Sequence, residues 1–180
     1  METLISIYEH SVGGNATFLL NIPPTKEGLF HENDVKRLHE IGEYQKKCYG
    51  KNLLEKASLF CEEQKKGFEI ENLRNDDYDS YFTTSDGQRN CRIHIKFDKE
   101  YDIHRVVLKE NIKKSQRIEA FRILTVHDGS EKCVFEGTVV GYKKIALLDQ
   151  IQTKELVKEL VIEIIDSRVA PTLSYIGIFE

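Results

Sequence analysis

The pattern of apolar and polar positions changes near Lys51. Before it, apolar side chains recur every three or four residues, which predicts two helices. The first carries Leu4, Tyr8 and Val12, and the second carries Val35, Leu38, Ile41, Tyr44 and Cys48. The apolar run between them, ATFLLNIPP at residues 16–24, is typical of a fully buried strand of a parallel sheet. Helix, buried strand and helix indicate a piece of an α/β fold.

After Lys51 the period becomes two. Along residues 91–97, four residues expected to face the core alternate with three polar ones. The first set is Cys91, Ile93, Ile95 and Phe97, and the second is Arg92, His94 and Lys96. Further strands are expected at residues 103–108, 118–126, 133–140, 142–148, 156–165 and 173–179. Several short strands separated by turn residues predict an antiparallel sandwich or barrel.

The two patterns predict a division into residues 1–50 and 51–180. A lone strand with two helices cannot bury its own apolar faces, so the first segment needs a partner. When the chain is present without another partner, we expect two copies to form a homodimer through residues 1–50.

Composition excludes some classes of protein. The chain has 180 residues, 40% of them hydrophobic and 31% charged, with a net charge of -4. No basic excess favours nucleic acid, and no apolar run approaches the roughly 20 residues of a membrane span. The opening residues METLISIYEH show no export signal. The four cysteines lack the close pairs of zinc or redox sites and are expected to be buried thiols.

Five segments, in this order, resemble the C-terminal part of the α-L-fucosidases of glycoside hydrolase family 29. The first, GNATFLLNIPPTKEGLFHENDVKRLHEIGEYQKKCYGKNL, resembles the last strand and closing helix of the catalytic barrel. The others resemble the sandwich that follows it: NLRNDDYDSYFTTSDGQ, SQRIEAFRI, EGTVVGYKKI and IIDSRVAPTLSYIGIF.

The resemblance implies a mainly β fold: a discoidin-like, galactose-binding-like antiparallel jelly roll after an α/β remnant of a TIM-like barrel. In that family the aspartate nucleophile and the glutamate acid/base of the retaining reaction precede the matched part, so no catalytic residue is expected here. The chain is then an accessory domain, inactive alone. Its partners would be its own barrel and fucosylated glycans, in a periplasmic, secreted or lysosomal setting. A free-standing carbohydrate-binding or adhesive module of discoidin type is the alternative.

Two groups of polar residues are candidate carbohydrate contacts. Glu110 is expected to lie between the guanidinium groups of Arg117 and Arg168, either as a structural ion-pair network or facing a sugar or the barrel. Asp86 and Gln88 follow the aromatic pair Tyr81-Phe82, which either forms a sugar platform or packs in the core.

The resemblance also implies a structural calcium held by the loop that contains Asn75, Asp77 and Ser80. A glutamate near the C-terminus often completes that site, but Tyr175 stands at the matching position here. Because the site is one ligand short, we expect no required cofactor, with calcium as the alternative.

Overall fold

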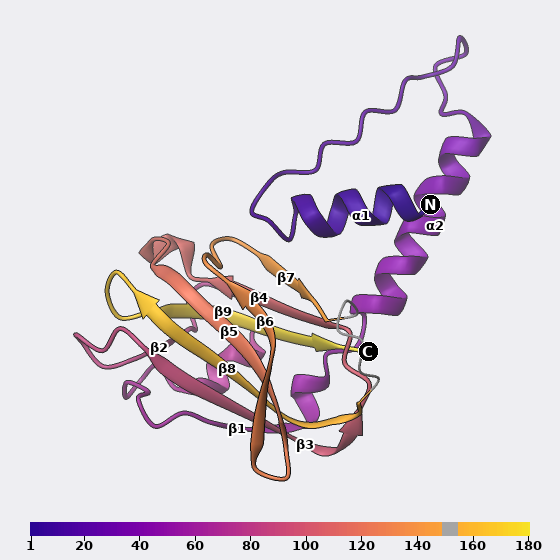
Figure 1. Cartoon of the computed structure of the whole chain (residues 1–180). Coiled ribbons are helices and arrows are strands. Elements are labelled where there is room, and N and C mark those ends of the chain that lie inside the picture. Colours follow the sequence, from indigo (N-terminus) through magenta and orange to yellow (C-terminus); the bar gives the residue numbers. More distant parts are fainter. Residues whose placement is uncertain (149–154) are drawn as a thin grey trace.

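A two-sheet β-sandwich carries a helical arm, defined as residues 1–50, that projects from its side (Figure 1). The structure is a computed structural model that describes residues 1–148 and 155–180. The arm contains helices α1 (Glu2–Ser11) and α2 (Glu32–Tyr49). Short 3-10 helices lie in the sandwich at Leu53–Lys56, Ile70–Arg74 and Ile112–Lys114.

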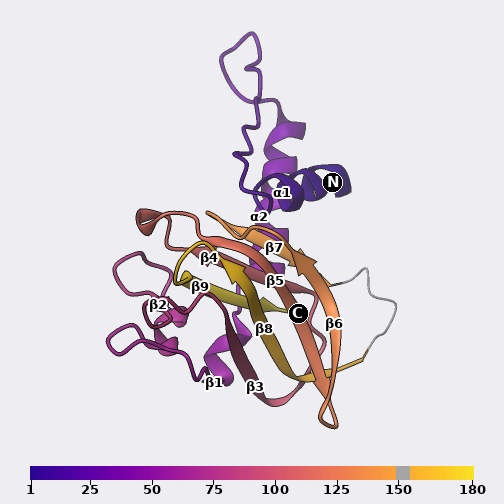
Figure 2. The same ribbon diagram turned by 60° about the vertical axis from the view of Figure 1, so that its left-hand side comes forward.

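The sandwich is antiparallel in the described residues. One sheet has the order β1-β3-β8-β5-β6 and the other the order β2-β9-β4-β7 (Figures 1 and 2). The first consists of β1 (Ala57–Phe60), β3 (Cys91–Tyr101), β8 (Val157–Ser167), β5 (Ile118–His127) and β6 (Ser130–Gly137). The second consists of β2 (Phe82–Thr83), β9 (Thr172–Phe179), β4 (Arg105–Glu110) and β7 (Lys144–Leu147).

The predicted sandwich is confirmed, and alternation explains its core. On β3, Cys91, Ile93 and Ile95 are almost completely buried, whereas Lys96 is exposed. The central strand β8 is buried more continuously, since Leu160, Val161 and Ile162 are all inaccessible to solvent. Each expected strand overlaps an observed one, but β1 and β2 were not predicted because strands of four and two residues carry too little pattern.

The arm confirms its two predicted helices but not its strand. Residues 16–25 run as extended chain without strand pairing, and the side chain of Leu19 is 87% exposed. The prediction of a buried strand is wrong for this chain because no neighbouring strand is present to pair with it. Neither helix is long and apolar enough to cross a membrane, as far as the described residues go.

Close backbone packing joins the end of α1 to the edge strand β7. The N–H of Ile145 donates to the carbonyl of Gly13 at 3.2 Å, and Gly14 forms an isolated bridge with Lys144. A Cβ added at Gly13 would lie 2.2 Å from the carbonyl oxygen of Glu9 and 2.6 Å from Cβ of Ile145. Only glycine therefore allows this approach.

The cysteines correct one expectation. Cys61 and Cys91 are buried as predicted, but Cys48 is only half-buried and Cys133 is exposed on β6. Cys133 lies on an edge strand whose outer residues face solvent, which a spacing argument could not foresee.

Candidate functional site

Glu110 is a completely buried carboxylate, but it does not lie between two guanidinium groups. Its Oε1 accepts the N–H groups of Arg117 and Ile118 at 2.7 and 3.0 Å, and its Oε2 accepts that of Gly141 at 2.6 Å. The predicted network is wrong because the donors that satisfy Glu110 are backbone groups, which leave no trace in a side-chain pattern. Glu110 fixes two loops of the sandwich together.

The two arginines have other partners. The guanidinium of Arg117 donates to the carbonyls of Lys114 and Ala170, the latter at 2.8 Å. Arg168 pairs with Glu119 at 2.8 Å on the surface, where its side chain is 69% exposed. The structure therefore does not bring Glu110, Arg117 and Arg168 together as one site.

Asp86 and Gln88 lie on a polar turn that is satisfied internally. Asp86 pairs with Lys65 at 2.7 Å, and the amide of Gln88 donates to Asn90. Within the described residues, no hydrogen bond links this turn to Glu110. Phe82 is fully buried and Tyr81 packs on Phe68 with ring centroids 4.7 Å apart, so the aromatic pair serves packing.

The predicted calcium ligands do meet, but they bond to one another. Asp77 accepts the N–H groups of Asp79 and Ser80 at 2.8 and 2.7 Å and the hydroxyl of Ser80 at 2.9 Å. The amide of Asn75 donates to the same hydroxyl at 3.1 Å. These hydrogen bonds lower the pKa of Asp77, led by the one from the Ser80 backbone.

Positive charge is already present around this loop. The ammonium of Lys109 contacts both oxygens of Asp76 at 2.7 Å and lies 5.1 Å from the ring centroid of Tyr175, and Lys113 pairs with Asp79 at 3.3 Å. No group of three acidic, histidine or cysteine side chains suited to a metal occurs among the residues that the structure describes. The donor set does not fit calcium, because two ammonium groups already neutralise its acidic neighbours.

Sequence patterns do not indicate the buried polar cluster that lies between the arm and the sandwich. Glu9 on α1 accepts from Arg105 Nε on β4 at 2.8 Å and from the hydroxyls of Tyr44 and Tyr49 on α2 at 3.0 and 2.8 Å. Arg105 also donates to the Tyr44 hydroxyl at 2.6 Å. We call these four residues the joint, because they connect both helices to the sheet.

The hydrogen bonds of the joint favour the ionised form of Glu9. Burial opposes ionisation of Glu9, but hydrogen bonds from Arg105 and Tyr49 outweigh it and hold the pKa of Glu9 below its ordinary value. Burial, with the adjacent carboxylate, raises the pKa of both Tyr44 and Tyr49. Glu9 is thus a fixed anion beside a permanent cation, and this state suits a structural link better than proton transfer.

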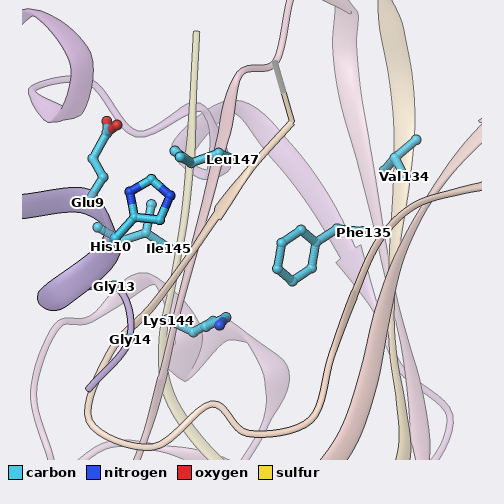
Figure 3. Close-up of a pocket in the computed structure, with 9 residues that line it drawn as sticks. All are labelled: Glu9, His10, Gly13, Gly14, Val134, Phe135, Lys144, Ile145 and Leu147. Carbon is cyan, nitrogen blue, oxygen red and sulfur yellow. The ribbon is translucent and has the colours of Figure 1, made fainter. Parts of the chain in front are cut away.

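A groove of about 310 Å³ lies between the end of α1 and strands β6 and β7 (Figure 3). The ring of Phe135 and the imidazole of His10 face each other across it, with Lys144 on one side and Leu147 on the other (Figure 3). The remaining lining residues are Glu9, Gly13, Gly14, Val134 and Ile145. It combines an aromatic ring, Phe135, with the ammonium of Lys144 and the imidazole of His10.

The arm also exposes an apolar surface. Leu19 is 87%, Leu29 69% and Phe30 56% exposed, and Val35 and Leu38 on α2 are more than a third exposed. A shallow hollow of about 140 Å³ opens on this surface, lined by apolar residues that include Leu4, Leu20, Ile22, Pro23, Leu38 and Ile41. We call the exposed apolar side chains and the residues that line this hollow, taken together, the arm surface.

Two family models match the chain in succession. The α-L-fucosidase model matches residues 1–51, and the model of anaphase-promoting complex subunit 10 matches residues 31–120. The second is a discoidin-like, galactose-binding-like fold, in agreement with the observed sandwich. A chitosan-binding module from Paenibacillus shares this fold with a TM-score of 0.61, covering 72% of the chain and 98% of the module at 13% identity.

Whole-chain relatives are fucosidases. α-L-fucosidase 1 of Arabidopsis thaliana is 31% identical over 98% of the chain, which spans 35% of the plant protein. A family 29 fucosidase of Ruminococcus gnavus, solved with fucose, is 29% identical with a TM-score of 0.88, covering 99% of the chain and 36% of the bacterial one. The chain therefore corresponds to the C-terminal region of the α-L-fucosidases of glycoside hydrolase family 29, and it spans about a third of the length of these relatives.

Proposed function

We propose that the chain is the accessory C-terminal part of a retaining α-L-fucosidase. In this proposal the arm surface covers a catalytic barrel supplied by the rest of the enzyme, and the sandwich holds the arm in place. The full enzyme hydrolyses α-L-fucosides in fucosylated glycans. The chain alone has no such activity.

The observation that carries this proposal is the exposure of the arm surface. Large contiguous apolar patches on a soluble protein mark interaction sites, because leaving them in water costs free energy. The segment of residues 16–25 is extended, and its side chains Leu19 and Leu20 are exposed, as in a strand without its sheet. The segment that matches the α-L-fucosidase model, residues 1–51, contains this whole surface.

The joint supports a rigid attachment. The arm can stabilise a bound barrel only if the arm itself is held rigidly on the sandwich. Glu9, Tyr44, Tyr49 and Arg105 connect both helices to β4 by hydrogen bonds of 3.0 Å or less. Tyr49 also packs against Phe179 of β9, with ring centroids 5.4 Å apart.

The state of two carboxylates bonded to arginines, Glu9 and Glu163, supports inactivity of the chain alone. A retaining glycosidase needs two carboxyl groups about 5 to 5.5 Å apart, one of them an acid with a raised pKa. Here hydrogen bonds from arginines outweigh burial and lower the pKa of both Glu9 and Glu163. Such carboxylates are poor general acids at neutral pH.

For the chain by itself, we propose that the arm surface pairs two copies. The same exposed side chains that would meet a barrel then bury each other. Light scattering of the full chain tests this proposal, with Leu19→Asp as the variant that should restore a monomer. A monomeric parent chain would contradict it.

The experiment for the main proposal is a chimera in which this chain replaces the matching region of the Arabidopsis enzyme. We expect the chimera to hydrolyse an aryl α-L-fucoside and the chain alone to show no turnover above buffer. A folded chimera without activity would contradict an accessory role. Turnover by the purified chain would contradict the absence of a catalytic pair.

A further inference from the structure

The groove beside α1 has the composition of a ligand site. Small-molecule sites are clefts of roughly 300 Å³ or more, mostly apolar, with a few well-placed polar groups. This groove has a comparable volume of about 310 Å³, with Phe135, Ile145 and Leu147 as apolar walls. Its polar side chains are Glu9, His10 and Lys144, and Glu9 is already bonded to Arg105.

Phe135 offers a flat apolar face. Its ring stacks on that of Phe121, with centroids 5.9 Å apart and an interplanar angle of 29°, so its orientation is fixed by the core. Phe135 itself is only partly buried and lies on the wall of the groove (Figure 3). A pre-oriented aromatic ring suits the apolar face of a sugar, because stacking then needs little ordering of the protein.

One polar group of the groove, the ammonium of Lys144, favours an anion. The ammonium of Lys144 lies 5.9 Å from the ring centroid of Phe135 and has no carboxylate partner among the described residues. His10 Nδ1 donates to the carbonyl of Ser6 at 2.8 Å, so in this tautomer Nε2 is left as an acceptor for a ligand hydroxyl. The Glu9 carboxylate points away from Lys144 and is committed to Arg105 (Figure 3).

The groove thus offers one cation, Lys144, which suits a carboxylate, and one acceptor, His10 Nε2, which suits a sugar hydroxyl. We propose that the groove binds a saccharide unit that carries a carboxylate, with the sugar ring on Phe135, the carboxylate at Lys144 and a sugar hydroxyl at His10. This inference goes beyond the accessory role and does not depend on it, because binding is measured on the chain alone.

The test is a titration followed by the amide NMR signals of the full chain. The probes are methyl β-D-glucuronide, its neutral analogue methyl β-D-glucoside, and acetate. We expect the glucuronide to shift the amide signals of Gly13, Gly14 and Lys144, and to bind about tenfold more tightly than either other probe, since one charge-assisted hydrogen bond is worth about that factor.

Variants separate the two parts of the site. Lys144→Gln should weaken glucuronide binding about tenfold and leave the weak glucoside binding unchanged, whereas Phe135→Leu should weaken both. Lys96→Gln, an exposed lysine on β3, is the matched control and should bind as the parent does. His10→Gln, on the surface of α1, tests the imidazole without disturbing the core.

Three outcomes would overturn the proposal. Equal affinity for glucoside and glucuronide would show that the groove does not recognise the carboxylate. Equal affinity for acetate would show binding of a carboxylate only. Absence of shifts around the groove at millimolar glucuronide, in a chain whose spectrum is folded, would show that the groove is not a saccharide site.

Discussion

The Glu9 carboxylate and the Arg105 guanidinium are 96 residues apart in the sequence and 2.8 Å apart in the structure. Both side chains are nearly inaccessible, at 7% and 11% exposure. Tyr44 and Tyr49 complete the same contact from α2. One buried ion pair and its two hydroxyl donors therefore attach the arm to the sandwich, together with the backbone contact of Gly13 with β7.

Removing the cation of this pair should be costly. Arg105→Met leaves the Glu9 charge buried without its main partner, so we expect a loss of about 3 to 5 kcal/mol in unfolding free energy. Arg37→Met is the control, because Arg37 is 55% exposed in its pair with Glu40, and its cost should stay below about 0.5 kcal/mol. Chemical denaturation measures both, and equal costs would show that the joint is not a stabilising contact.

The pKa of Glu9 gives the joint a defined pH dependence. In the folded chain its pKa is below the ordinary value of 4.5, so the unfolded state binds the proton more tightly. The stabilisation is therefore present above about pH 4.5 and is lost as pH falls through the folded pKa. Glu9→Gln removes it, so the difference in unfolding free energy between parent and variant should shrink below pH 4.5. A difference independent of pH between 3 and 7 would contradict the assignment.

Glu110 should matter for stability although it binds no guanidinium. Glu110→Gln replaces one acceptor oxygen by an amide donor that faces a backbone N–H, so we expect a cost of about 3 kcal/mol. Glu119→Gln breaks only the exposed pair with Arg168 and should cost less than about 0.5 kcal/mol. Thermal unfolding of both variants decides this, and similar melting temperatures would show that Glu110 is dispensable.

Calcium should not stabilise the chain. A ligand that binds the folded state raises its unfolding free energy with concentration. The acidic neighbours of Asp77 are paired with Lys109 and Lys113, so we expect no shift in melting temperature between millimolar calcium and excess chelator. A saturable increase in the melting temperature of the parent chain with calcium concentration would show that the loop does bind calcium.

Sequence patterns predicted the sandwich because alternation on strands such as β3 directly reflects which side chains face the core. Sequence patterns failed where the structure of a segment, or the contacts of a side chain, depend on groups far away in the sequence or outside the chain. The run Leu19 to Ile22 has the pattern of a buried strand, but this chain supplies no strand to pair with it. Glu110 was singled out correctly as an unusual charge, but its partners are backbone groups. Glu9 and Arg105 carried no signal, because nothing local indicates that two distant charges will meet.

The central claim is that the arm surface is built to be covered by a catalytic barrel. Leu19→Asp tests it most directly, because Leu19 is 87% exposed in the chain and its replacement should cost less than about 0.5 kcal/mol there. In the Arabidopsis chimera the same substitution would bury a carboxylate in an apolar contact, and we expect a loss of more than about 3 kcal/mol and of most fucosidase activity. Val169→Asp, at a sandwich residue that is 51% exposed, is the control and should be neutral in both settings. A chimera that tolerates Leu19→Asp as well as the isolated chain does would show that the arm surface does not meet the barrel.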